Sequence, residues 1–138
     1  METLERPTIS RPRVSLWSLR VVLATHLLAV LAQPVLAGLY LTGDVDAIGW
    51  HGDVGSLLAA VALLVVAAAL SYVLAGRGGW WVLAVAVLLF LADGYQIGAG
   101  FERALAIHIP LGVLIVLASV LFTAWSWTPF ASRARGAR

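Results

Sequence analysis

Four long apolar runs constrain the fold of this chain more than any other feature of its sequence. They cover approximately residues 19–41, 54–75, 80–98 and 104–127, and each is close to the ~20 residues that a helix needs to cross the hydrocarbon core of a bilayer. Because lipid offers no hydrogen bonds, the backbone of such a segment satisfies its polar groups internally as a helix. The sequence therefore predicts an all-α integral membrane protein with four spans.

Composition agrees with insertion into a lipid bilayer. Of the 138 residues, 62% are hydrophobic and 12% are charged, whereas an ordinary soluble domain has about 45–50% apolar and about 25% charged residues. The first apolar run is longer than the core of a signal peptide, and it has no clear small-x-small cleavage site, so we expect it to remain as a helix. The chain then divides into a basic amino-terminal segment (1–18), a four-helix domain (19–127) and a basic tail (128–138).

Short, glycine-bearing connections join the four runs, at residues 42–49, 76–79 and 98–103. Helices joined by short links pack as antiparallel neighbours. The connections therefore predict an up-down-up-down four-helix bundle.

Arginine sets the expected orientation, since the chain contains no lysine. Positive residues concentrate on the cytoplasmic side of membrane proteins, and one side here has Arg6, Arg11, Arg13, Arg20, Arg77, Arg133, Arg135 and Arg138. The other side has Arg103 together with Asp44, Asp46, Asp53 and Glu102. We therefore expect a multi-pass protein of the inner (cytoplasmic) membrane with both termini in the cytoplasm. The aromatic residues near the span ends are expected at the interface: Trp50, Trp80, Trp81, Trp125, Trp127, Tyr72 and Tyr95.

Two histidines are the strongest candidates for a functional site. His51 and His108 are each followed four residues later by glycine, at Gly55 and Gly112, and the expected topology places both at similar depth on the second and fourth helices. Ionisable residues within a membrane are costly and mark functional sites by default. Two imidazoles can ligate one haem iron from opposite sides, and the glycines leave room for a porphyrin on the same helix face. The pattern predicts a haem b site near the outer face.

A cofactor-free alternative remains open from the residues alone. Small residues also let helices pack closely without any ligand, and each histidine could simply be a hydrated residue bonded to a loop carbonyl. The chain would then be a structural or accessory membrane subunit. A faint internal repeat is also present, because Gln33 precedes the connection that leads to His51 and Gln96 precedes the one that leads to His108.

Four short motifs occur along the chain: Gln33 with Ala37-Gly38, His51-Gly-Asp-Val-Gly55, Gln96 and His108-Ile-Pro-Leu-Gly112. Together they extend over about residues 21–125, and they resemble an uncharacterised family of small bacterial four-helix membrane proteins. More distantly, the arrangement resembles one half of haem A synthase, which has histidines on the second and fourth helices of each half. Ile48 and Gly52 stand where that family has a glutamate and an arginine, and the chain has four apolar runs rather than eight. The resemblance therefore implies a haem-binding module that can work as a homodimer, rather than an autonomous synthase.

The rest of the sequence contains no recognisable set of catalytic residues. A phosphate loop and a His-Glu-x-x-His motif are absent, no serine is placed in sequence beside a base with an orienting acid, and the lack of cysteine excludes thiolate ligation. The expected activity is electron transfer with a quinone or a membrane oxidoreductase partner, and the arginines indicate topology rather than nucleic-acid binding. His26 lies deeper than the pair and receives no catalytic role, while Asp93 is either solvated or holds an imidazole N–H.

Overall fold

The computed structural model describes residues 14–134, and the part it describes is helical. The elements are α1 (Val14–Leu41), α2 (Ala47–Leu74), α3 (Trp80–Phe101), α4 (Leu105–Ser126) and the short 3₁₀ helix η1 (Pro129–Ser132). All four α-helices are long and apolar enough to cross a membrane. The expected all-α, four-helix, multi-pass membrane fold is therefore confirmed.

The helices are longer than the apolar runs suggested at several ends. α1 begins five residues before the expected span, and α2 begins at Ala47, so that His51 lies one turn inside α2 rather than at its start. The basic tail also has structure, because η1 forms within it. Two groups of predicted cytoplasmic arginines lie outside the described residues: Arg6, Arg11 and Arg13, and Arg135 and Arg138.

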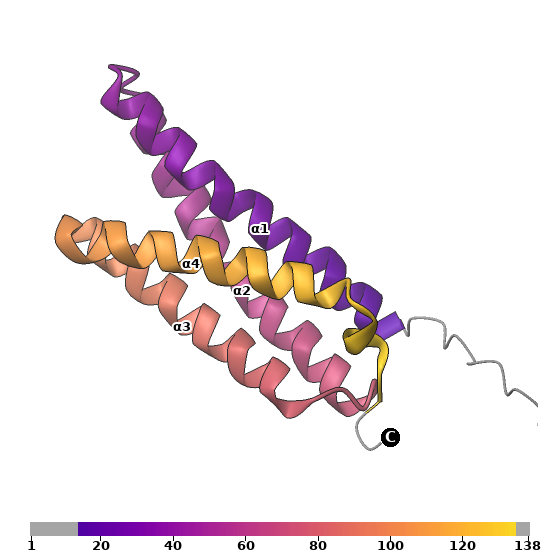
Figure 1. Cartoon of the computed structure of the whole chain (residues 1–138). Helices are drawn as coiled ribbons and strands as arrows, with labels where there is room; N and C mark the ends of the chain where they lie inside the picture. The colour runs from indigo at the N-terminus through magenta and orange to yellow at the C-terminus, as the bar shows by residue number, and fades with distance from the viewer. Residues whose placement is uncertain (1–13, 135–138) are drawn as a thin grey trace, which may run out of the picture.

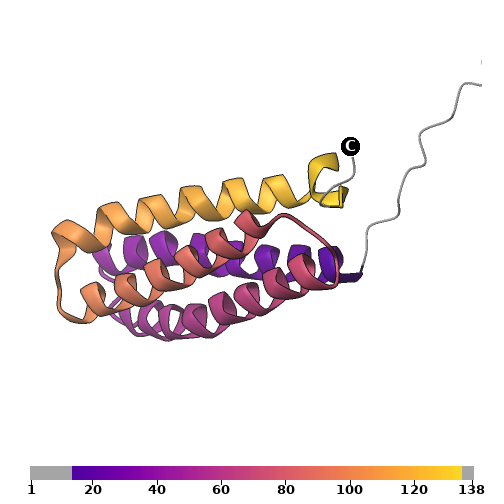
Figure 2. The ribbon, with the colours of Figure 1, turned by 90° about the horizontal axis from the view of Figure 1, so that it is seen from below.

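Consecutive helices lie side by side, and α4 completes the ring by packing against α1. Figures 1 and 2 show the helices running alongside one another, with the connections 42–46 and 102–104 at one end and the start of α1 and η1 at the other. We call the first the histidine end, because it contains His51 and His108. We call the second the basic end, because it contains Arg20, Arg77 and Arg133.

The buried core is concentrated toward the basic end. On α1 the last buried side chain is Val30, and on α4 the first is Ile115. In α2 none is buried between Ala47 and Leu58. Figure 1 shows the α1–α2 pair and the α3–α4 pair diverging toward the histidine end. Tight apolar packing therefore holds one half of the bundle and leaves the other half loosely filled.

At the basic end, aromatic side chains tie the chain after α4 to the bundle. The Arg20 guanidinium contacts the indoles of both Trp17 and Trp127, 5.0 and 4.7 Å from their ring centres, and its Nε donates to the Ser126 carbonyl at 2.8 Å. Tyr72, expected at the interface, is instead buried and donates its hydroxyl to the Ala131 carbonyl at 2.8 Å. Burial is favourable here because that bond satisfies the phenol.

Candidate functional site

His51 and His108 come together between the helices of the histidine end. Their ring centres are 6.1 Å apart and their planes are inclined by 58°. They belong to α2 and α4, which are not neighbours in the ring of helices, so the two imidazoles meet across the bundle rather than along one helix contact. Both side chains are half-buried.

Each imidazole is anchored to the helix that precedes its own. His51 Nδ1 lies 3.2 Å from the backbone carbonyl oxygen of Gln33 on α1, and His108 Nδ1 lies 2.9 Å from that of Gln96 on α3. When Nδ1 carries the proton, it donates to the carbonyl and leaves the lone pair on Nε2. Within residues 14–134, Nε2 of neither ring has a hydrogen-bond partner. The expected repeat of glutamine, histidine and glycine therefore corresponds to two equivalent hydrogen bonds.

The two glutamine side chains also lie beside the two glycines. With its amide nitrogen toward His51, Gln33 donates to Nδ1 at 2.9 Å and its oxygen accepts from the Gly55 N–H at 3.1 Å. In that arrangement Nδ1 accepts, so the proton of the ring sits on Nε2. The orientation of the Gln33 amide and the tautomer of His51 are therefore coupled.

Gln96 occupies the space over Gly112. A Cβ atom added there would lie 2.8 Å from Gln96 Nε2, whereas one added at Gly55 would meet nothing within 4 Å. Gln96 Oε1 is buried without a hydrogen-bond partner. A buried, unpaired amide oxygen costs free energy, and here it lies on the residue whose carbonyl anchors His108. A side chain added at Gly55 would thus meet open space, whereas Gly112 is covered by an amide with one unsatisfied atom.

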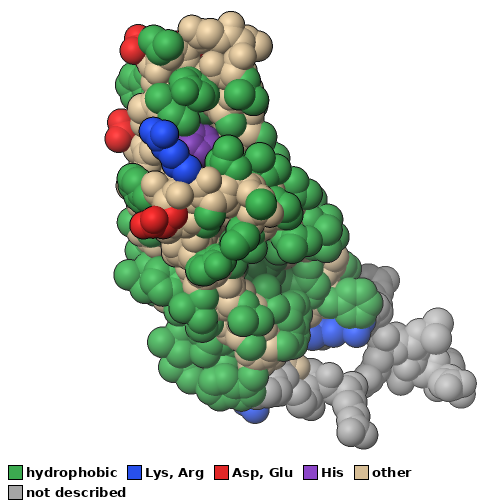
Figure 3. Space-filling model, turned by 90° about the vertical axis from the view of Figure 1, so that its left-hand side faces the viewer, with side chains coloured by type: hydrophobic (Ala, Val, Ile, Leu, Met, Phe, Trp, Pro, Cys, Tyr) green, Lys and Arg blue, Asp and Glu red, His purple; other side chains and the backbone are tan. Residues whose placement is uncertain are grey.

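Charged side chains lie on the surface of the histidine end. Figure 3 looks onto the histidine end and shows histidine atoms at the surface beside arginine atoms, with acidic groups on either side. The exposed charged residues at this end are Asp44, Asp46, Asp53, Glu102 and Arg103. Among the described residues, no group of three or more His, Cys, Asp or Glu side chains could hold a metal ion, so a metal here would depend on the imidazole pair.

The structure brings His26, Asp93 and Ser119 together, a cluster that was not recognised in the sequence. His26 Nε2 lies 2.8 Å from Asp93 Oδ2, and its Nδ1 lies 3.4 Å from Ser119 Oγ. Asp93 therefore holds the imidazole of His26 rather than that of His51 or His108. These residues come from three different helices and share no sequence spacing, so no pattern of a serine beside a base with an orienting acid could reveal them in the sequence.

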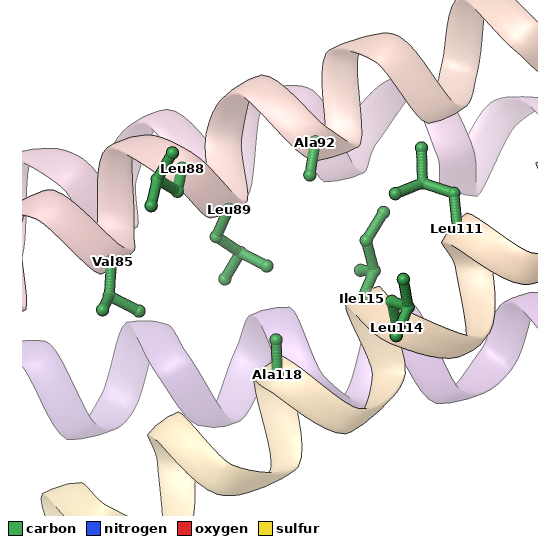
Figure 4. Close-up of a pocket in the computed structure, with 8 residues that line it drawn as sticks. All are labelled: Val85, Leu88, Leu89, Ala92, Leu111, Leu114, Ile115 and Ala118. Atoms are coloured by element: carbon green, nitrogen blue, oxygen red, sulfur yellow. The ribbon is translucent and has the colours of Figure 1, made fainter.

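Two shallow pockets open elsewhere on the outside of the bundle. One of about 280 Å³ lies between α3 and α4 and is lined by aliphatic side chains alone (Figure 4): Val85, Leu88, Leu89, Ala92, Leu111, Leu114, Ile115 and Ala118. The other is near Gly94 and Ile107. Without polar groups, the first pocket offers a hydrocarbon chain a surface but gives no hydrogen bond that would fix a ligand.

In comparisons with models of protein families, with curated proteins and with solved structures, no match to this chain was found.

Proposed function

We propose that the protein is a membrane-embedded b-type haem-binding module in which His51 and His108 ligate one iron. The observation that carries the proposal is the 6.1 Å separation of the two ring centres. Two metal–nitrogen bonds of about 2 Å each, together with the half-width of each ring, place the centres of two axial imidazoles roughly 6 Å apart. The two side chains already have the spacing of a bis-imidazole pair.

The hydrogen bonds at Nδ1 support the same proposal. Histidines that ligate metals usually donate their other ring N–H to a carbonyl or a carboxylate, which fixes the orientation and the tautomer of the ring. The Gln33 and Gln96 carbonyls are positioned to accept in this way. Ligation through Nε2 requires the Nδ1–H tautomer of both rings, so it also requires the Gln33 amide to turn its nitrogen away from His51.

The residues around the pair can make room for a porphyrin. The histidine end has few buried side chains, and the space over Gly55 is open. Over Gly112 the Gln96 side chain would have to move aside, which would free its amide for a polar edge of the bound group. Bound haem would supply one-electron transfer, with a quinone or a membrane oxidoreductase as the exchange partner. In this proposal the bundle is up-down-up-down, both termini are cytoplasmic, and the pair lies near the outer face of the inner membrane.

A cofactor-free structural subunit is the second candidate, and one observation favours it. Each imidazole already joins two helices through a carbonyl, His51 to α1 and His108 to α3. Hydrogen bonds of this kind between membrane helices stabilise a bundle by about 0.6 kcal/mol on average. In this alternative the histidines fasten the loosely packed end and bind nothing.

A reduced-minus-oxidised visible spectrum of the purified full-length protein, expressed with ample haem, tests the proposal. Two neutral imidazoles should give low-spin, six-coordinate iron with sharp α and β bands on reduction. His51→Ala and His108→Ala should each lose this spectrum, and any haem that a variant retains should become high-spin and bind carbon monoxide.

The control removes the third imidazole together with its carboxylate partner, as His26→Leu with Asp93→Val, so that no unpaired charge is left buried. This double variant should keep the low-spin spectrum. A monodisperse wild-type protein that is colourless after expression with ample haem contradicts the haem proposal and leaves the structural one.

A further inference from the structure

His26, Asp93 and Ser119 lie deep inside the bundle, and each comes from a different helix. Their side chains are 0%, 3% and 1% exposed. A carboxylate and an imidazole in the interior of a membrane protein are expensive, and such residues typically mark ion or proton pathways. Stability alone does not account for them, because a buried ionisable pair can often be replaced by apolar residues without loss of stability. The cluster therefore needs an explanation beyond packing.

The bonding within the cluster suits proton transfer. The imidazole contacts the Ser119 hydroxyl through Nδ1 at 3.4 Å and the Asp93 carboxylate through Nε2 at 2.8 Å. A histidine can accept a proton at one ring nitrogen while it releases another from the opposite nitrogen. His26 thus stands between a hydroxyl on one side and a proton-accepting carboxylate on the other.

A file of hydroxyl groups continues from Ser119 to the basic end. Thr123 and Ser126 follow it on the same face of α4, at intervals of four and three residues. Thr123 Oγ1 lies 3.4 Å from the Leu23 carbonyl of α1, and Ser126 Oγ donates to the Thr123 carbonyl at 2.6 Å. The Ser126 carbonyl then accepts from Arg20. Successive hydroxyls are about one helical turn apart, a gap that one bridging water molecule can span.

Polar groups also continue from Asp93 to the histidine end. Gln96 lies one turn further along α3, and its buried Oε1 has no partner. An unsatisfied buried oxygen is the kind of group that holds an internal water molecule. The carbonyl of the same residue bonds His108, which reaches the surface at that end. A series of buried or half-buried polar groups therefore extends from Arg20 at the basic end to His108 at the histidine end.

The file lies between α1, α3 and α4, and within residues 14–134 no charged side chain other than those of the pair faces it at the depth of His26 and Asp93; Arg20 meets its far end. α2 presents apolar side chains to the same interior, including Val61, Ala62 and Val65. Between Ser56 and Ser71, α2 contains no ionisable residue. The titratable groups of the file at this depth are thus His26 from α1 and Asp93 from α3, with the Ser119 hydroxyl from α4.

We propose that this file is a proton pathway between the basic end and the histidine end, with the His26–Asp93 pair as its proton-holding site. A proton that arrives through Ser126, Thr123 and Ser119 binds His26 Nδ1, and the proton on Nε2 passes to Asp93 Oδ2. The carboxylic acid then releases it to water held by Gln96. Rotation of the imidazole about its Cβ–Cγ bond restores the starting tautomer. The pathway does not depend on haem at His51 and His108.

Proton flux into proteoliposomes tests this proposal. The full-length protein is reconstituted into vesicles that contain potassium and a pH-sensitive dye, and valinomycin sets the membrane potential. Wild-type vesicles should acidify at least tenfold faster than protein-free vesicles. Asp93→Asn keeps the size of the side chain but cannot accept the proton, so its flux should fall at least tenfold, while Asp93→Glu should restore part of it. Ser119→Ala should lower the flux by interrupting the file.

Thr25→Val and Ser56→Ala are matched controls, because both residues are exposed on the outside of the bundle and their hydroxyls bond carbonyls of their own helices. Both should conduct like the wild type. If Asp93→Asn is not monodisperse, Ser119→Ala decides the matter, since it leaves the His26–Asp93 pair intact. Wild-type flux no faster than that of protein-free vesicles, or wild-type flux in a folded Ser119→Ala or Asp93→Asn protein, overturns the proposal.

Discussion

His26 and Asp93 are separated by 67 positions in the chain, yet Nε2 of the imidazole and Oδ2 of the carboxylate meet at 2.8 Å inside the bundle. The contact joins α1 to α3, two helices that lie diagonally across the ring. His51 and His108 form a second diagonal contact, between α2 and α4 at the histidine end. The bundle thus has two polar centres at different depths, and each can be tested separately.

Removing one partner of the His26–Asp93 pair should lower the free energy of unfolding, whereas replacing both partners with apolar residues should not. Asp93→Ala leaves a buried imidazole without its partner, and we expect a loss of about 3–5 kcal/mol in the free energy of unfolding. The double variant His26→Leu with Asp93→Val removes both polar groups and should be as stable as the wild type or more so. Unfolding in mixed micelles with increasing denaturing detergent measures both. Equal losses in the single and the double variant would show that the site cannot repack.

Alanine substitutions at the two glycines of the candidate haem site should have different effects on the stability of the haem-free protein. At Gly55 an added methyl group meets nothing within 4 Å, so Gly55→Ala should stabilise α2 by up to about 1 kcal/mol through helix propensity. At Gly112 the methyl group meets the end of the Gln96 side chain at 2.8 Å, so Gly112→Ala should gain less or lose stability. Thermal unfolding of the two haem-free variants gives the comparison.

Larger side chains at these glycines should prevent haem binding without preventing insertion of the protein into the membrane. Gly55→Leu and Gly112→Leu should both reach the membrane and both lose haem, because leucine would occupy the space of the porphyrin. The haem-to-protein ratio of the purified variants measures this loss. Full haem content in both variants would contradict the proposed place of the porphyrin.

The Tyr72 hydroxyl should contribute measurably to the packing of η1. Tyr72→Phe removes the hydrogen bond to the Ala131 carbonyl and should cost about 0.5–1.5 kcal/mol. Tyr95→Phe is the matched control, because Tyr95 is exposed on α3. Removing its hydroxyl group should leave the melting temperature unchanged. A Tyr72→Phe protein that melts like the wild type would mean that water replaces the bond.

Reporter fusions test the orientation inferred from arginine. Fusions at Gly78 and at the carboxyl terminus should report the cytoplasm, and a fusion at Asp46 should report the outside. An outside signal from Gly78 would reverse the bundle, and the histidine pair would then face the cytoplasm.

The sequence alone determined the number and approximate limits of the helices, because the cost of unpaired backbone groups in lipid makes each long apolar run a helix. It also indicated His51 and His108 as a pair, since two matched His-x-x-x-Gly elements stand out against apolar surroundings. The equivalence of Gln33 and Gln96 could be suspected for the same reason. Each of these inferences depends on residue type and spacing along one helix.

Which faces of the helices meet depends on packing between helices, and the sequence did not reveal it. A membrane helix that is apolar on all sides carries no amphipathic pattern to show which side turns inward, so the rotation of α1, α3 and α4 could not be predicted. That rotation buries His26, Asp93 and Ser119 together and places Gln96 over Gly112, and the packing of α2 puts Tyr72 in the core rather than at the expected interface. Contacts between distant segments are set by side-chain packing across helices, and spacing within one segment does not encode them.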